Sequence, residues 1–200
     1  KSIQVRNFRS FQDSGKIEFK SINLFLGKNS SGKSSILRLF PLFKQSILHE
    51  LRGPLMWYDE TYDFGSFSNV LSRHSIDDGR LKFIIDIDLP HKKCPKNSCK
   101  DCFIYRDKQN PFLIGASSCL LEMVVGEDKK GTFLQELNLH LDCHNILLSC
   151  ENREGDVDIF LDNQKIGIPP VKWKYKTKGL LPDMISRKPV GQDFLLSKLF

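Results

Sequence analysis

The 200-residue sequence predicts an α/β fold with a large antiparallel β-lobe. An apolar run at Ser21–Leu26, a glycine-rich loop and an amphipathic segment from Lys33 follow one another, which is the order strand, loop, helix. From Leu81 onward, short alternating runs are separated by turns with Gly, Asn or Asp, as is typical of antiparallel strands. We therefore expect two parts, at residues 1–80 and 81–200.

The first part is expected to open with a hairpin, because two segments that alternate apolar and polar side chains flank a turn. The following helix contains Pro41, which cannot donate the backbone hydrogen bond of a helix interior, so a kink or break is expected there. The predicted elements are strands at 2–8, 16–20 and 21–26, a helix from 33 to about 49–51 and a short helix at 67–73.

The second part is expected to be mostly antiparallel sheet. A loop at 91–111, rich in lysine and cysteine and bounded by Pro90 and Pro111, interrupts it. Residues 192–200 are predicted to begin an amphipathic helix. The predicted strands lie at 81–88, 118–125, 132–142, 145–150, 157–161 and 165–168.

Composition indicates a globular protein, with 40% hydrophobic and 27% charged residues. No apolar run reaches the ~20 residues that span a bilayer, so we expect a cytoplasmic protein without membrane contact. The net charge of +6 permits a DNA or RNA partner. Lysines alternate with Trp173 and Tyr175 over Lys172–Lys178, which fits either a phosphate-contacting strand or a solvated strand face backed by two core aromatics.

The glycine-rich loop fits the phosphate-binding pattern G-x-x-x-x-G-K-[ST]. Its glycines let backbone N–H groups converge on phosphate oxygens, while Lys33 neutralises the β- and γ-phosphates and the Ser34 hydroxyl ligates Mg²⁺. The pattern therefore predicts a P-loop nucleotide-binding core within residues 1–80. The residues expected at the nucleotide are Gly27, Lys28, Asn29, Ser30, Ser31, Gly32, Lys33, Ser34 and Ser35.

The opening Ile3-x-Val5-x-Asn7-Phe8-Arg9-Ser10-Phe11, followed by a hairpin and the phosphate loop, resembles ABC-type ATPases of the RecF, SMC and OLD-nuclease kind. The segment Asp63–Phe67, with Trp57 and Tyr58 before it, is similar to the ATPase subunits of Septu and retron-associated anti-phage systems. These motifs cover residues 2 to about 75, and the second part of the chain lies outside them.

The resemblance implies the N-terminal part of an ATPase head, in which the phosphate loop sits on a mixed sheet beside a β-lobe. It implies that Asn7, Arg9 and Ser10 lie near the nucleotide, with the loop at 63–67 where such ATPases sense the γ-phosphate. A glutamine usually fills the sensing role, and Phe64–Phe67 contains none. The resemblance also implies a homodimer that sandwiches ATP between two heads, and a partner nuclease, of HNH type in Septu-like systems.

Hydrolysis of ATP needs a carboxylate that holds magnesium and a general base beside it. No run of four apolar residues ends in Asp-Glu; the nearest candidates, at Asp162-Asn163 and Asp86, lack the base. A Leu-Ser-Gly-Gly-like signature is also missing, and the first residue is lysine. We therefore expect these 200 residues to be the N-terminal part of a longer ATPase and to be inactive alone.

The cysteine-rich loop carries one histidine and three cysteines at a spacing that could close a tetrahedral zinc site with one imidazole and three thiolates, although it has only one Cys-x-x-Cys pair. Free cysteines in an exposed insertion are the alternative. Cys119, Cys143 and Cys150 are expected to be small core residues, and His74, His140 and His144 to pack or lie at the surface. The candidate zinc ligands are His91, Cys94, Cys99 and Cys102.

Three functions remain open from the sequence. The first is an ATP-binding and ATP-hydrolysing head that drives a defence or DNA-repair complex. The second is an OLD-like nuclease whose cleavage domain lies beyond residue 200. The third is a scaffold that binds nucleotide without hydrolysing it. The loop reads phosphates and no guanine-reading Asn-Lys-x-Asp occurs, so the choice between ATP and GTP also stays open.

Overall fold

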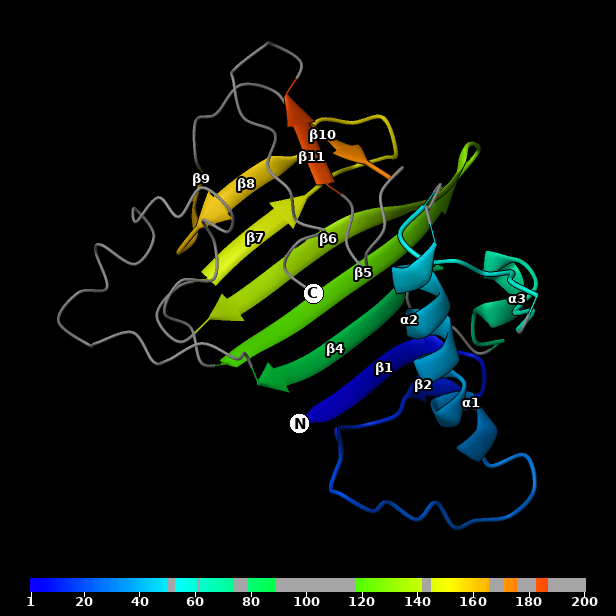
Figure 1. Cartoon of the computed structure of the whole chain (residues 1–200). Coiled ribbons are helices and arrows are strands. Elements are labelled where there is room, and N and C mark those ends of the chain that lie inside the picture. Colours follow the sequence, from blue (N-terminus) through cyan, green and yellow to red (C-terminus); the bar gives the residue numbers. More distant parts are fainter. Residues whose placement is uncertain are drawn as a thin grey trace, which may run out of the picture.

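The computed structural model describes residues 1–49, 53–60, 62–73, 79–88, 118–141, 145–165, 171–175 and 183–186. Within these ranges the chain forms one nine-stranded sheet, a two-stranded ribbon and three helices (Figure 1). The strand order is β2-β1-β4-β5-β6-β7-β8-β9, and β3 pairs with β1. All pairings between the described strands are antiparallel.

The strands are β1 (Ser2–Phe8), β2 (Phe11–Asp13), β3 (Ile17–Glu18), β4 (Leu81–Asp88), β5 (Ser118–Asp128), β6 (Gly131–Leu141), β7 (Asn145–Ser149), β8 (Asp158–Leu161), β9 (Gln164–Lys165), β10 (Val171–Lys174) and β11 (Asp183–Ser186). The helices are α1 (Lys33–Leu37), α2 (Leu39–Leu48) and α3 (Phe67–Val70). The strands predicted at 2–8, 81–88, 118–125, 132–142, 145–150 and 157–161 form close to their expected bounds, and the one at 16–20 forms only at Ile17–Glu18. The strand predicted at 21–26 does not form, and most of the one at 165–168 lies outside the described residues. The predicted helix at 192–200 and loop at 91–111 lie outside the described residues.

Alternation of apolar and polar residues places one face of each central strand in the core, because successive side chains point to opposite faces. In β4, Leu81 and Phe83 are fully buried, and in β5 Leu121 and Met123 are as well. β4 lies between β1 and β5, so Val5 faces Phe83 across one pairing. The two predicted parts, 1–80 and 81–200, thus contribute neighbouring strands to the same sheet.

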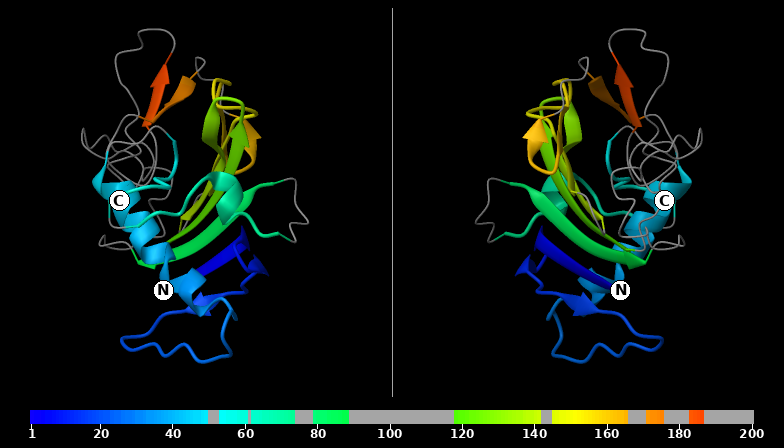
Figure 2. Two further views of the ribbon diagram at one scale, coloured as in Figure 1. Left: turned by 90° about the vertical axis from the view of Figure 1, so that its right-hand side faces the viewer. Right: turned by 90° about the vertical axis from the view of Figure 1, so that its left-hand side faces the viewer.

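Helix α2 lies over one face of the sheet, which Figure 2 shows from its side, with the β10–β11 ribbon on that same side. Phe43 of α2 packs edge-to-face on Phe83, with the ring centroids 5.5 Å apart, and Phe8 meets Phe83 at 6.2 Å. Full burial of a phenylalanine side chain contributes about 1.5–3 kcal/mol. This aromatic contact therefore anchors the helices over β1 and β4.

The predicted helix is interrupted at Arg38, between α1 and α2. Pro41 has no N–H to donate to the carbonyl of Leu37, and its ring clashes with a carbonyl four residues earlier in a continuous helix. The break therefore comes three residues before the proline, at the end of the turn that follows the phosphate loop. As a result, α1 has only five residues.

The predicted strand at 21–26 is wrong: these residues form no strand and extend as a loop. The alternating side chains Ile22, Leu24 and Leu26 are 90%, 80% and 81% exposed. No described strand lies beside this segment, so its backbone groups have no ladder to join. The pleated pattern is present in the sequence, but a strand forms only where another strand accepts its hydrogen bonds.

Two side chains of the ribbon cap the β6 backbone where β7 has ended. The ladder between β5 and β6 shifts at Val124/Val125, where Leu134 pairs with Val125 of β5. On its other side the β7 register begins only at Glu136, so no β7 residue is paired with Leu134. The Trp173 Nε1–H donates to the Leu134 carbonyl at 2.9 Å, and the Leu134 N–H donates to the Tyr175 hydroxyl at 2.9 Å. These aromatics therefore replace a missing strand by satisfying one donor and one acceptor.

Candidate functional site

The phosphate loop adopts backbone conformations that favour glycine. Gly32 has φ of 93° and ends the loop at the first turn of α1. A Cβ at Gly32 would lie 2.4 Å from the Phe11 ring and 2.8 Å from the Ser10 hydroxyl oxygen. A Cβ at Gly27, whose φ is 156°, would lie 2.9 Å from the Ser31 hydroxyl oxygen. The glycines thus allow the loop to pack tightly against the β1–β2 turn.

The Lys33 ammonium lies inside the loop and bonds to its backbone. Its Nζ donates to the carbonyl of Gly27 at 2.8 Å and to that of Lys28 at 2.6 Å, with Ser31 Oγ at 3.4 Å. In a P-loop the lysine ammonium reaches the β- and γ-phosphates, and here it is held by oxygens of the loop itself. The loop therefore carries its positive charge at its centre.

A cleft of about 350 Å³ opens between the phosphate loop and the β1–β2 turn. Of the residues predicted at the nucleotide, Asn29 to Ser35 and Arg9 line it, together with Ser10. Gly27 and Lys28 lie beneath it as the lysine's acceptors. Asn7 does not line the cleft: it is 3% exposed and its Nδ2 donates to the Arg80 carbonyl at 2.8 Å.

Arg9 occupies a constrained position in the cleft wall. It is the first of two turn residues between β1 and β2, and such tight hairpins require positive φ at that position, here 50°. A non-glycine residue with positive φ costs about 1–2 kcal/mol, and such residues cluster at functional sites. Burial lowers the pKa of the Arg9 guanidinium, and the positive charge of Arg38 lowers it further.

The segment from Trp57 to Ser72 lies beside this turn. The Arg9 guanidinium carbon stands 5.5 Å from the centroid of the Phe64 ring. The Phe64 N–H donates to the Trp57 carbonyl at 2.8 Å, and Asp63 Oδ1 accepts from the Gly65 N–H at 2.7 Å. The predicted γ-phosphate-sensing loop at 63–67 is thus placed next to the cleft through Arg9.

The model of the AAA ATPase domain family matches residues 1–131, from β1 through the phosphate loop to the β5–β6 turn. The chain belongs to this AAA ATPase domain family. Comparisons with curated proteins and with solved structures return no match. As a member of an ATPase domain family with a phosphate loop, this chain is a P-loop ATPase domain, and its ligand is ATP.

The cleft of this AAA ATPase domain provides several groups that can bind phosphate but few ligands for magnesium. Backbone groups, Lys33 and Arg9 fit a polyphosphate, and Ser34 supplies one hydroxyl oxygen for Mg²⁺. No carboxylate belongs to the described lining of the cleft. Asp86 pairs with Ser2 at the far end of β1, roughly 20 Å away at strand spacing. Asp162 follows β8, about 24 Å from β1 across the intervening strands.

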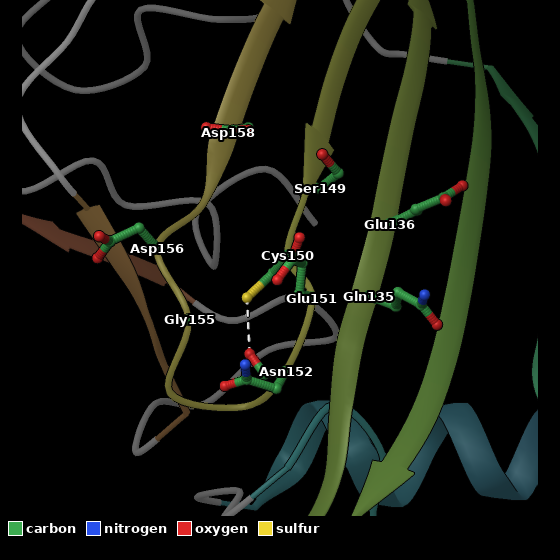
Figure 3. A pocket seen from close by; sticks show the side chains of 9 residues that line it. All are labelled: Gln135, Glu136, Ser149, Cys150, Glu151, Asn152, Gly155, Asp156 and Asp158. Atoms are coloured by element: carbon green, nitrogen blue, oxygen red, sulfur yellow. Dashed lines mark hydrogen bonds between the residues drawn. The ribbon is translucent and has the colours of Figure 1, made fainter.

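A second and larger cleft, of about 430 Å³, lies where β7 leads into β8 (Figure 3). Carboxylates line it, and Figure 3 shows the Cys150 thiol bonding to the Asn152 carbonyl, at 2.7 Å. Burial raises the pKa of this thiol. Because the acidic lining repels phosphates, this cleft is unsuited to ATP. Its lining acids are Glu136, Glu151, Asp156 and Asp158.

The candidate zinc ligands His91, Cys94, Cys99 and Cys102 lie outside the described residues, as do His74, Cys143 and His144. Within the described ranges, no group of three or more metal-ligating side chains could hold a metal ion. Cys119 and Cys150 are 1% and 5% exposed, which confirms that they are core residues. Among the helices described, none is long and apolar enough to cross a membrane.

The lysine-rich strand shows its predicted burial in part. Trp173 and Tyr175 share the buried face, with exposures of 6% and 8%. Lys172 is partly exposed, whereas Lys176 and Lys178 lie outside the described residues. The two aromatics are therefore core residues, and contact of the lysines with DNA or RNA stays a prediction.

Proposed function

We propose that ATP binds with its phosphates in the cleft between the phosphate loop and the β1–β2 turn. One observation supports this most strongly: two cationic side chains, Lys33 and Arg9, share a cleft whose described lining contains no acid. Such a site attracts a polyanion through backbone donors, an ammonium and a guanidinium acting together. The family match of residues 1–131 identifies the nucleotide as ATP.

Each residue has a distinct task in this proposal. On binding, Lys33 exchanges its bonds with the Gly27 and Lys28 carbonyls for bonds with phosphate oxygens. Backbone N–H groups of residues 29–35 hold the remaining oxygens, and Ser34 supplies a ligand for Mg²⁺. The metal would neutralise charge that develops on the phosphates. Gly32 keeps the loop against Phe11, so that the donors stay directed into the cleft.

The more specific function that we propose for this ATPase domain is that of an ABC-type head within an anti-phage defence complex. We propose that two heads close around ATP, that the closed dimer controls a nuclease or nucleic-acid partner, and that the protein acts in the cytoplasm. The likeness of the 2–11 motif to RecF-, SMC- and OLD-type ATPases, and of the 57–67 segment to Septu- and retron-type ATPases, supports this. The carboxylates for hydrolysis would then come from outside the described residues, since Asp86 and Asp162 lie far from the loop.

A nucleotide-binding scaffold without hydrolysis is the second candidate. It is favoured by the same lack of carboxylates in the described lining of the cleft. In that case ATP would hold the β1–β2 turn and the 57–72 segment together for a partner, and no phosphate would be released. Turnover separates the two candidates, because both bind ATP and only the head hydrolyses it.

The test measures ATP binding by calorimetry and phosphate release by the full-length protein in the presence of Mg²⁺. Lys33→Ala should abolish detectable binding, because it removes the cation at the centre of the loop. The matched control is Lys44→Ala, which removes an exposed lysine from α2 and should leave affinity unchanged. Wild-type affinity in Lys33→Ala would refute the proposed site. Binding without phosphate release would favour the scaffold.

A further inference from the structure

Arg9 is held in the cleft wall by an aromatic ring. Its guanidinium carbon lies 5.5 Å from the centroid of Phe64, which is 3% exposed. The Arg9 Nε is buried and has no hydrogen-bond partner among the described residues. A positively charged group in such a position is commonly paired with a carboxylate, yet here it faces a ring and the like charge of Arg38.

The same segment also fixes the Arg9 backbone. The Arg9 N–H donates to the Val70 carbonyl at 2.7 Å, and Leu71 forms a bridge with Phe8. Phe64 is fixed in turn by its N–H bond to Trp57. Backbone and side chain of Arg9 are therefore both set by residues 57–72, which are distant from it in sequence.

We propose that Phe64 is a positioning residue for ATP: its ring holds the Arg9 guanidinium at the cleft so that the guanidinium contacts phosphate oxygens. The inference rests on the proposed function, since it assigns the site a second cationic anchor. It also gives the 63–67 loop a task in this chain, which has no glutamine there.

The choice of a ring over a carboxylate has a physical reason. A carboxylate would neutralise Arg9 and occupy its N–H donors in fork geometry, and phosphate would have to compete for them. A ring face attracts the cation through its quadrupole and uses none of the five donors. The guanidinium is thereby kept in place while its donors stay free for phosphate.

The test compares two phenylalanines of the same segment. Phe64→Leu removes the ring that contacts Arg9, whereas Phe67→Leu removes an equally buried ring that contacts Trp57 at 5.7 Å. Calorimetric titration of the full-length protein with ATP and Mg²⁺ should show about two- to tenfold weaker binding for Phe64→Leu, the range of a partly desolvated cation–π contact. Phe67→Leu should bind ATP with an affinity within about twofold of wild type, although both substitutions should lower the melting temperature.

Two further variants separate positioning from folding. Phe64→Tyr keeps a ring face and should restore wild-type affinity. In an Arg9→Ala background, Phe64→Leu should cause no further loss, because the group that it positions is gone. If Phe64→Leu does not fold, Phe64→Met takes its place.

The outcomes distinguish this inference from the function on which it rests. Wild type that fails to bind ATP overturns both. Wild type that binds, with Lys33→Ala inactive and Phe64→Leu equal to Phe67→Leu, overturns the role of Phe64 alone. Additive losses for Arg9→Ala and Phe64→Leu overturn it as well, because they would show that the two residues act independently.

Discussion

Replacing Tyr175 by phenylalanine removes one oxygen atom from the cap on β6. The Tyr175 hydroxyl accepts the Leu134 N–H at 2.9 Å, and the Tyr175 side chain is 8% exposed. Phenylalanine keeps the ring, its packing and its contact with the Arg153 guanidinium, whose carbon lies 5.2 Å from the ring centroid. The substitution therefore isolates one hydrogen bond at the point where β6 is paired with β5 but no longer with β7.

The expected loss follows from a buried donor left without an acceptor. Leaving a buried N–H without an acceptor lowers the free energy of unfolding by about 1–3 kcal/mol. The phenylalanine ring has the same shape as the tyrosine ring, so no change in packing offsets this loss. For a chain of 200 residues, each kcal/mol lowers the melting temperature by about 2–4 °C. Tyr175→Phe should therefore lower the free energy of unfolding by about 1–3 kcal/mol and the melting temperature by roughly 2–12 °C.

Urea unfolding followed by tryptophan fluorescence measures this loss, since Trp173 is buried in the core and Trp57 packs against the core. Tyr58→Phe is the matched control, because Tyr58 is 64% exposed and its substitution should change stability by less than ~0.5 kcal/mol. Equal stability of Tyr175→Phe and Tyr58→Phe would show that the cap contributes nothing, and the reasoning about the open β6 backbone would be refuted.

Gly32→Ala should weaken ATP binding and lower the melting temperature, since its Cβ would meet the Phe11 ring at 2.4 Å; wild-type calorimetry and melting would contradict this. Burial raises the pKa of both the Cys150 thiol and the Tyr175 hydroxyl, so the folded state retains protons that the unfolded chain releases. Stability in urea should fall as pH rises above about 8.5, and again above about 10, and Cys150→Ala should remove the first step. Leu24→Ser, at a position 80% exposed, should change stability by less than ~0.5 kcal/mol; a larger loss would mean that the segment is packed.

The strands of the sheet were predictable because each carries its own signal. In β4, alternation of apolar and polar residues marks both faces, and the observed bounds of Leu81–Asp88 match the predicted range. Burial of Cys119 and of the Trp173–Tyr175 face followed from the same period. Such patterns are local, and the sheet satisfies them because every one of these strands has a neighbour.

The segment at 21–26 carries the same signal, but the strand prediction there was wrong. Alternation of apolar and polar residues is typical of a strand, but a strand also needs another strand to pair with, and none of the described sheet lies beside this segment. A kink or break was predicted from Pro41, but its position at Arg38 was not. Proline disturbs the carbonyl four positions earlier, so the helix is interrupted before the proline itself.

At the site, the phosphate loop was predictable from four residues at fixed positions, and the position of Arg9 beside it was implied by resemblance. The contact of Arg9 with Phe64 was not foreseen, because 55 residues separate them and neither residue carries a motif for the other. The available signals were the aromatic residues without a sustained period within 55–80, and the resemblance that places both Arg9 and the 63–67 loop near the nucleotide. Tertiary packing gives that segment its partner.

The hydrogen bonds of Lys33 to its own loop bear on how the loop would bind and release a nucleotide. Two backbone carbonyls hold the ammonium in the structure, so under the proposed function ATP would bind by exchanging these oxygens for phosphate oxygens at the same nitrogen. The loop is already wound around its lysine, so we expect little ordering entropy to oppose binding. We expect the carbonyls to return to the ammonium when the nucleotide leaves, which would keep the loop in one shape between successive nucleotides.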